Sequence, residues 1–202
     1  MATLALILYV VYLLLAFGLR TLIQLRRTGS TGFHGLGGRP GSAEWIAGVG
    51  FTVALLLGAA APVLALLDVI EPIGALDVMA LHVAGLVLAV AGIAATFYAQ
   101  VAMGTSWRIG VDPSERTALV TAGPFALVRN PIFAAMLPTA LGLTLLVPSW
   151  VAIAGLVGLV AALELQVRVV EEPYLRQIHG ESYADYAARV GRFVPGMGRL
   201  QS

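Results

Sequence analysis

Residues 123–137, GPFALVRNPIFAAML, place two prolines, an arginine and an asparagine directly before a long apolar run. Pro131 keeps Asn130 out of helical geometry and can itself begin a helix. The first backbone N–H groups of that helix have no intrahelical partners and can point at an anion. Arg129 adds a fixed charge that can bind a carboxylate through two hydrogen bonds. The stretch predicts a polar corner at the mouth of an apolar helix, although Arg129 alone is also typical of a topological anchor.

The composition is that of a membrane protein. Of 202 residues, 59% are hydrophobic and 11% are charged, and the mean hydropathy is +0.90. A soluble domain carries about 25% charged residues, so we expect a polytopic membrane protein. The net charge of +1 gives no indication of nucleic-acid binding. With no Cys and 3 His, the chain has no thiol chemistry, and we expect no metal site.

The apolar residues fall into five segments, which predict an all-α protein with five transmembrane helices. The first three segments are long enough to cross about 30 Å of hydrocarbon. The fourth is short, so it begins at Pro131, tilts, or stops before the far interface. Only Pro148, Ser149 and Trp150 lie around the junction of the last two, which predicts a tight helical hairpin. The segments are 4–25, 45–67, 77–103, 132–147 and 149–169.

The connections between these segments differ in charge, and this difference predicts the topology. The connection before the third segment is acidic, whereas the other long connections and the tail carry arginine. By the positive-inside rule, the N-terminus lies outside and the C-terminus is cytoplasmic, in a bacterial cytoplasmic membrane. We expect an N-terminal membrane part at 1–103 and a cofactor-binding part at 104–202 within one structural domain. The marker residues are Arg26, Arg27, Arg39, Asp68, Glu71, Asp77, Arg108, Arg116, Arg129, Arg176, Arg189, Arg192 and Arg199.

A second polar stretch, 163–195, follows the fifth segment. Helical spacing places Glu164, Arg168 and the pair Glu171–Glu172 along one face, either as a structural ion-pair ladder or facing a wet cavity. Pro173 fits a helix break or the first turn of the next helix. Residues 174–189 are amphipathic and aromatic, which predicts a helix at the membrane interface.

Residues 29–42, GSTGFHGLGGRPGS, are rich in glycine. Such a stretch can cradle phosphate when it follows a strand and carries a P-loop lysine. The sequence has neither feature here, so it favours a flexible loop.

GPFALVRNPIF followed by EEPYLRQIHGESYADYAARVGRFVP resembles the isoprenylcysteine carboxyl methyltransferase and phospholipid methyltransferase superfamily. The resemblance covers about 105–195. It is specific, because the order of the motifs, their spacing and the intervening hairpin all agree. Asn130 stands where the family has His, and Phe133 where it often has Tyr. Asn can hydrogen-bond but cannot carry a proton as imidazole does, which favours a contact role over a general base. The matching positions are Gly123, Pro124, Phe125, Arg129, Pro131, Glu171, Glu172, Leu175, Gly180, Tyr183, Tyr186, Phe193 and Pro195.

The resemblance implies an integral membrane enzyme that binds S-adenosylmethionine in a cytoplasmic pocket of its C-terminal half, with a lipophilic acceptor entering from the surrounding membrane lipids. It implies catalytic roles for Arg129, Asn130 and Glu172. The glutamate pair would bind the ammonium or ribose hydroxyls of the cofactor, and Trp107 is a further aromatic candidate beside the sulfonium. The implied cofactor contacts are Gly123, Pro124, Val128, Arg129, Asn130, Pro131, Phe133, Glu171, Glu172, Tyr183 and Tyr186.

Two other functions fit the same residues. One is a non-catalytic, transporter-like membrane protein in which the Glu164–Arg168–Glu171 ladder is structural or handles protons. The other is a membrane reductase of related architecture with a nicotinamide cofactor. The methyl acceptor stays open among prenylcysteine, phospholipid amine, thiol and fatty acid, and the oligomeric state stays open too.

Overall fold

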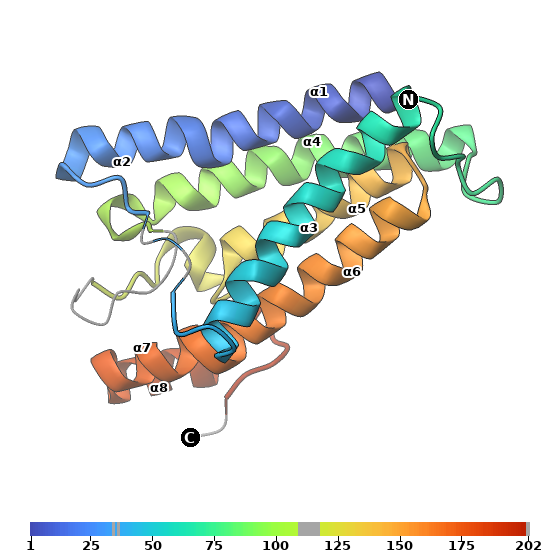
Figure 1. The fold of residues 1–202 in the computed structure, drawn as a ribbon. Coiled ribbons are helices and arrows are strands. Elements are labelled where there is room, and N and C mark those ends of the chain that lie inside the picture. The colour runs from blue at the N-terminus through green and yellow to red at the C-terminus, as the bar shows by residue number, and fades with distance from the viewer. Residues whose placement is uncertain (34, 36, 109–117, 201–202) are drawn as a thin grey trace.

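The computed structural model describes residues 1–33, 35, 37–108 and 118–200, and over these residues the chain is helical with no strand (Figure 1). Four helical runs are long and apolar enough to cross a membrane, and α5 is a shorter apolar helix. The prediction of an all-α membrane protein is therefore confirmed, whereas a fifth span through α5 stays a prediction. Arg116 and part of the Gly-rich stretch lie outside the described residues. The four runs are Ala2–Thr28, Ala43–Leu66, Met79–Ala102 and Trp150–His179.

The element order follows the predicted segments closely. The first run consists of α1 (Ala2–Leu13), the π-helical turn η1 (Leu14–Leu19) and α2 (Arg20–Thr28). Next come α3 (Ala43–Leu66), α4 (Met79–Ala102) and two short 3₁₀ turns, η2 (Gly104–Ser106) and η3 (Gly123–Ala126). The last part holds α5 (Pro131–Leu146), α6 (Trp150–Leu165), the π-helical turn η4 (Gln166–Glu171), α7 (Glu172–His179) and α8 (Glu181–Arg189).

Small residues determine which helices pack together. A Cβ at Gly142 of α5 would lie 2.5 Å from the Gly85 carbonyl oxygen of α4, so these two backbones touch. On the other side, Gly155 of α6 brings that helix against Ala54 and Leu57 of α3. The turn between α5 and α6 is as short as predicted, yet each helix packs mainly on another partner, α5 on α4 and α6 on α3 (Figure 1). The predicted tight hairpin is therefore a tight turn between two separately packed helices.

The helix that begins at Trp150 does not break at Pro173. It runs on to His179 through η4, and Pro173 occupies the first turn of α7, where a missing N–H is tolerated. One of the two predicted alternatives, the first turn of a further helix, is thus confirmed. A glycine with positive φ, Gly180 (φ 52°), ends α7 before α8 begins.

The aromatic face of α8 packs on the protein itself. Tyr183 and Tyr186 are buried against Leu119 and Leu175, and the predicted position of this helix at the membrane interface stays a prediction. After α8, residues 190–200 return along the corner before α5, and we call this segment the C-terminal strap. Val128 pairs with Gly191 there in an isolated parallel bridge. The functional division of the chain at residue 103 stays a prediction.

Candidate active site

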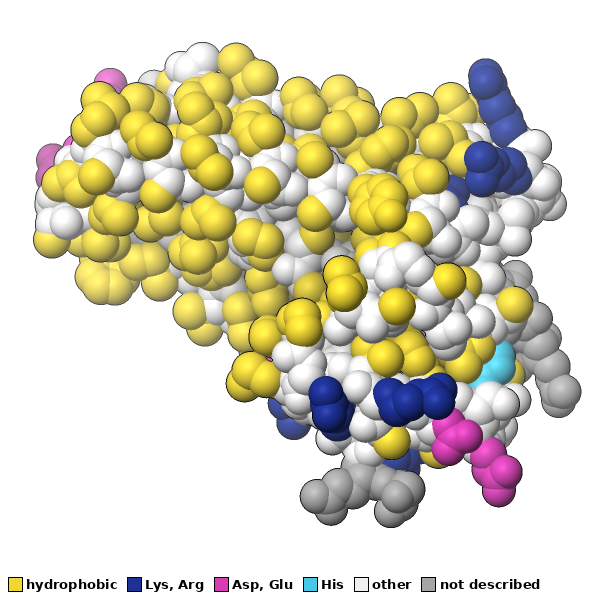
Figure 2. Space-filling view, turned by 180° about the vertical axis from the view of Figure 1, so that it is seen from behind, with side chains coloured by type: hydrophobic (Ala, Val, Ile, Leu, Met, Phe, Trp, Pro, Cys, Tyr) yellow, Lys and Arg dark blue, Asp and Glu magenta, His cyan; other side chains and the backbone are white. Residues whose placement is uncertain are grey.

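A cavity of about 470 Å³ opens among the helix ends that carry most of the arginines. On the face shown in Figure 2, hydrophobic side chains cover the shaft of helices and basic side chains gather at one end. Ligand cavities usually measure about 300–1,000 Å³, so this one can hold a small molecule. Its polar wall includes Arg129, Asn130, Gln166, Glu171, Tyr183 and Tyr186, and its apolar wall includes Phe17, Phe51, Leu55, Phe133 and Met136.

Arg129 is buried and its terminal nitrogens are fully engaged. Nη1 donates to the carbonyl oxygens of Ala187 (3.0 Å) and Val190 (2.5 Å). Nη2 donates to Glu172 Oε1 (2.6 Å) and to the Gly198 carbonyl oxygen (3.1 Å). Its Nε is buried without a hydrogen-bond partner in the described part of the chain. Of its five N–H donors, Nε is therefore the one that remains for a ligand.

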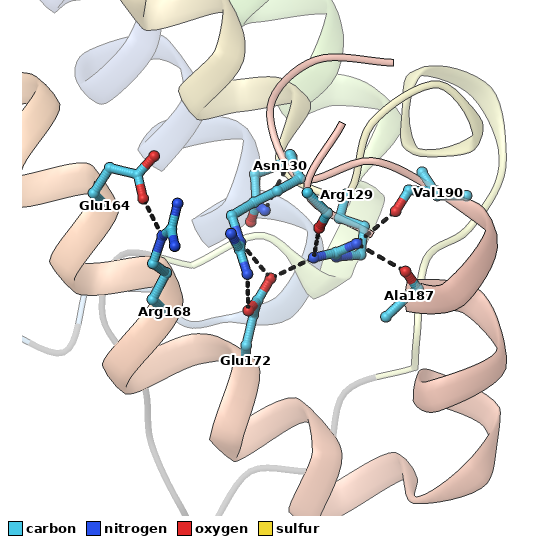
Figure 3. Close-up of polar contacts among 9 residues, drawn as sticks. Arg129, Asn130, Glu164, Arg168, Glu172, Ala187 and Val190 are labelled. Carbon is cyan, nitrogen blue, oxygen red and sulfur yellow. Dashed lines mark hydrogen bonds and ion pairs between the residues drawn. The ribbon is translucent and has the colours of Figure 1, made fainter. Parts of the chain in front are cut away.

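Glu172 binds two arginines at once. In addition to Arg129, it accepts from Arg192 Nε at Oε1 and from Arg192 Nη2 at Oε2, both at 2.8 Å. The Glu172 side chain is only 8% exposed. These hydrogen bonds raise the pKa of the Arg192 guanidinium above its usual value, so Arg192 is charged. Figure 3 shows Glu172 directed at Arg129 and away from Arg168.

Of the ion-pair ladder, one of the two predicted alternatives, only the first pair is present in the described residues. Arg168 pairs with Glu164, and both side chains are well exposed, at 56% and 38%. Glu172 instead binds Arg129 and Arg192, and the π-helical turn η4 departs from the α-helical spacing on which the ladder was predicted. Among the described residues, neither a pairing of Glu172 with Arg168 nor a continuous line of charges is present.

Glu171 lies on the cavity wall, whereas Glu172 does not. Gln166, at the other end of η4, donates from Nε2 to Glu171 Oε1 (3.3 Å) and lines the same wall. Of the glutamate pair, Glu171 is accordingly the one that a cavity ligand can meet, and Glu44 of α3 also lines the cavity. The prediction that Glu172 grips the cofactor directly is not supported by this arrangement, because both Glu172 oxygens are bound by arginine.

Asn130 is held by the strap. Its backbone N–H and its side-chain Nδ2 both donate to the Arg192 carbonyl oxygen, at 3.1 and 3.2 Å. Pro131 begins α5 as predicted, and Pro131 and Phe133 line the cavity beside Asn130. Val128 and the residues of η3 that the resemblance named, Gly123 and Pro124, do not line it.

The aromatic candidates all line the cavity, but they differ in whether their rings are free to contact a ligand. Tyr183 and Tyr186 line the cavity, and burial raises the pKa of each to about 12, so both stay protonated at neutral pH. The Tyr186 hydroxyl donates to the Phe125 carbonyl oxygen (2.6 Å). Trp107 also lines the cavity, but Arg20 covers its ring at 4.5 Å from the centroid. A cation therefore already occupies one face of Trp107, which weakens its candidacy as a sulfonium partner.

Sequence reasoning missed the N-terminal wall of the cavity. Phe17 of η1, Phe51 of α3, and Phe33 with Gly35 and Gly37 of the Gly-rich stretch all line it. The stretch that the sequence indicated as a plain loop thus forms part of the site. A usable signal was Arg20, a charge inside an apolar helix, which normally marks a buried functional region. Arg20 donates to the Gln100 and Gly104 carbonyl oxygens and anchors the end of α4 beside the cavity.

These features define an integral membrane protein with a ligand-sized cavity at the arginine-bearing end of its helices. The phospholipid methyltransferase family profile matches residues 80–182. The chain belongs to the phospholipid methyltransferase family and is a membrane methyltransferase. No curated protein matches the chain significantly.

Proposed function

We propose that the protein transfers a methyl group from S-adenosylmethionine to a lipophilic acceptor, in the manner of isoprenylcysteine carboxyl methyltransferase. The observation that carries this proposal is the composition of one cavity. Its polar wall comes from the corner before α5, from η4 and from α8, and its apolar wall comes from η1, α3 and the first turns of α5. A polar cofactor and an apolar acceptor can therefore lie side by side.

The residues on the polar wall fit the methionine end of this cofactor. Arg129, Arg192 and Glu172 form a buried cluster with two positive charges and one negative charge, and Arg129 Nε has no partner among the described residues. Glu171 provides a carboxylate on the same wall. A positive cluster and a separate carboxylate suit a group that carries both an α-carboxylate and an α-ammonium.

S-adenosylmethionine supplies, when bound, a sulfonium-activated methyl group for direct displacement by the acceptor. The chain aligns the reactants and excludes water. Buried Tyr183 and Tyr186 do this on the polar, cofactor side of the cavity, and Phe17 and Phe51 do it on the acceptor side. Asn130 cannot serve as a base, because its amide does not titrate and it donates to the strap. An acceptor that arrives ionised fits this site best.

The orientation belongs to the same proposal. The arginine-bearing end of the molecule faces the cytoplasm, α5 is a fifth span, and the N-terminus lies outside. Reporter fusions at the two ends test this topology, and both ends on one side of the membrane would contradict it.

The binding experiment measures S-adenosylmethionine and S-adenosylhomocysteine by calorimetry in detergent. We expect micromolar affinity, about −8 kcal/mol. Glu171→Gln should weaken binding roughly ten- to a hundredfold, because a hydrogen bond to a charged group contributes about 1.5–3 kcal/mol. Glu164→Gln is the matched control on the same helical run, is exposed, and should bind normally. Failure of the unmodified protein to bind either ligand at millimolar concentration would refute the proposal.

A further inference from the structure

Arg192 lies beyond residues 80–182, the part of the chain that matches the family. It is 8% exposed and grips Glu172 through two parallel hydrogen bonds of 2.8 Å. Arg129 already provides one cation for Glu172. The second cation is therefore more than charge neutralisation of Glu172 requires.

The strap does not depend on the Arg192 side chain for its position. Backbone bonds hold it: Arg129 N–H donates to the Gly191 carbonyl (2.8 Å), and Arg192 N–H donates to the Met197 carbonyl (2.8 Å). A Cβ at Gly191 would lie 2.7 Å from the Met197 carbonyl oxygen, so the turn is closed tightly by backbone alone. A variant that shortens the Arg192 side chain should keep the strap in place.

Within the described residues, the acidic and phenolic groups next to the cluster do not compensate its charge. Glu164 is paired with Arg168, and Glu171 is bonded to Gln166 on the cavity wall. Tyr183 is neutral at ordinary pH. The cluster of Arg129, Glu172 and Arg192 thus carries one net positive charge, which reaches the cavity through Arg129.

We propose that Arg192 is a positioning residue that determines how tightly the cavity holds the α-carboxylate of its ligand. It acts through Glu172: because Arg192 binds both Glu172 oxygens, the charge of Arg129 is only partly neutralised and stays available to an anion. This inference rests on the proposed function, since it assigns the carboxylate to the methyl donor.

The test compares two ligands that differ in this group. S-adenosylhomocysteine carries the amino acid end, and methylthioadenosine shares the nucleoside and thioether but lacks that end. Both are titrated by calorimetry into the unmodified protein, Arg192→Met, Arg192→Lys and the control Arg189→Met. Arg189 is exposed on α8 just before the strap.

Arg192→Met should weaken S-adenosylhomocysteine roughly ten- to thirtyfold, as expected for loss of one charge at an effective dielectric near 20, and leave methylthioadenosine unchanged. Arg192→Lys keeps the charge and should restore most of the discrimination, and Arg189→Met should match the unmodified protein. In turnover, the donor KM should rise in the Met variant while the acceptor KM stays constant. If Arg192→Met does not fold, Arg192→Gln carries the same comparison.

Equal weakening of both ligands would overturn the inference and assign Arg192 to structure alone, and unchanged binding of both would overturn it as well. If the unmodified protein binds methylthioadenosine but gains nothing from the amino acid end, the carboxylate assignment fails while nucleoside binding survives. Binding of neither ligand overturns the proposed function together with this inference.

Discussion

The packed apolar helices, which we call the shaft, and the corner formed by the residues before α5, Glu172 and the C-terminal strap are stabilised in opposite ways. In the shaft, Gly142 and Gly85 let two backbones touch, with apolar side chains around them. In the corner, Arg129 and Arg192 enclose Glu172, and nearly every polar atom has a partner. Lipid tails are as apolar as the helices, so shape has to determine contacts in the shaft. Buried charges in the corner need each other, so pairing determines the structure there.

The largest effect should come from removing the charge at the centre of the corner. Glu172→Gln leaves Arg129 and Arg192 buried beside a neutral amide, and losing one partner of a buried ion pair costs about 3–5 kcal/mol. We therefore expect a marked fall in the thermal midpoint in detergent and loss of cofactor binding.

Glu164→Gln provides the control for this variant. Its pair with Arg168 is exposed, and such pairs contribute about 0–1 kcal/mol, so its midpoint should hardly move. Equal midpoints for the two variants would show that burial does not separate the two ion pairs.

The next effect should come from the shaft. Gly142→Ala places a methyl group against the Gly85 carbonyl oxygen and the Ala89 backbone nitrogen, and neither can move aside without shifting α4. Overpacking of this kind costs about 1–3 kcal/mol, measurable as a lower thermal midpoint. Gly158→Ala is the matched test, since its Cβ would meet only the Ala54 Cβ at 3.8 Å. A drop of the same size at Gly158 would contradict the assignment of close packing to α4 and α5.

The smallest effect should come from the rim of the corner. Tyr186→Phe removes the hydrogen bond to the Phe125 carbonyl oxygen, a loss of about 1 kcal/mol. Burial raises the pKa of Tyr186 to about 12, above the unfolded value near 10. Its contribution should be complete below pH 10 and fall away as the pH rises towards 12. Stability curves of the two proteins against pH should therefore converge in that range, and parallel curves would contradict the buried hydroxyl.

Much of the shaft could be predicted from the sequence, because apolar length alone defines a spanning helix. The start of α5 at Pro131 followed from the stereochemistry of proline. The pairing of α5 with α4 could not be predicted, since it depends on which glycines of two distant segments meet. The cavity wall from η1 and α3 was missed for the same reason, because apolar side chains facing lipid and ligand look alike in sequence.

The corner was predicted by residue type but not by connection. Arg129, Asn130 and the two glutamates were all expected near the cofactor, and they do lie together. The partners of the glutamates could not be predicted, because helical spacing was counted at 3.6 residues per turn through η4 and the strap is distant in sequence. Arg192 was treated as a topological marker, although it stands directly before Phe193, a position that the resemblance already included.

Deletion of a single residue, Val169 or Val170, would remove the surplus residue of η4 and restore ordinary α-helical winding. Each residue of an α-helix advances by about 100°, whereas the wider turn winds less per residue, so η4 takes up its extra residue with little added rotation. After the deletion, the two ends of the long Trp150–His179 run should therefore keep their relative rotation, with α6 still packed on α3 and Glu172 still bound to the strap. The wide turn is thus a position at which this helix can change its length by one codon while its apolar part and its cavity end stay in phase.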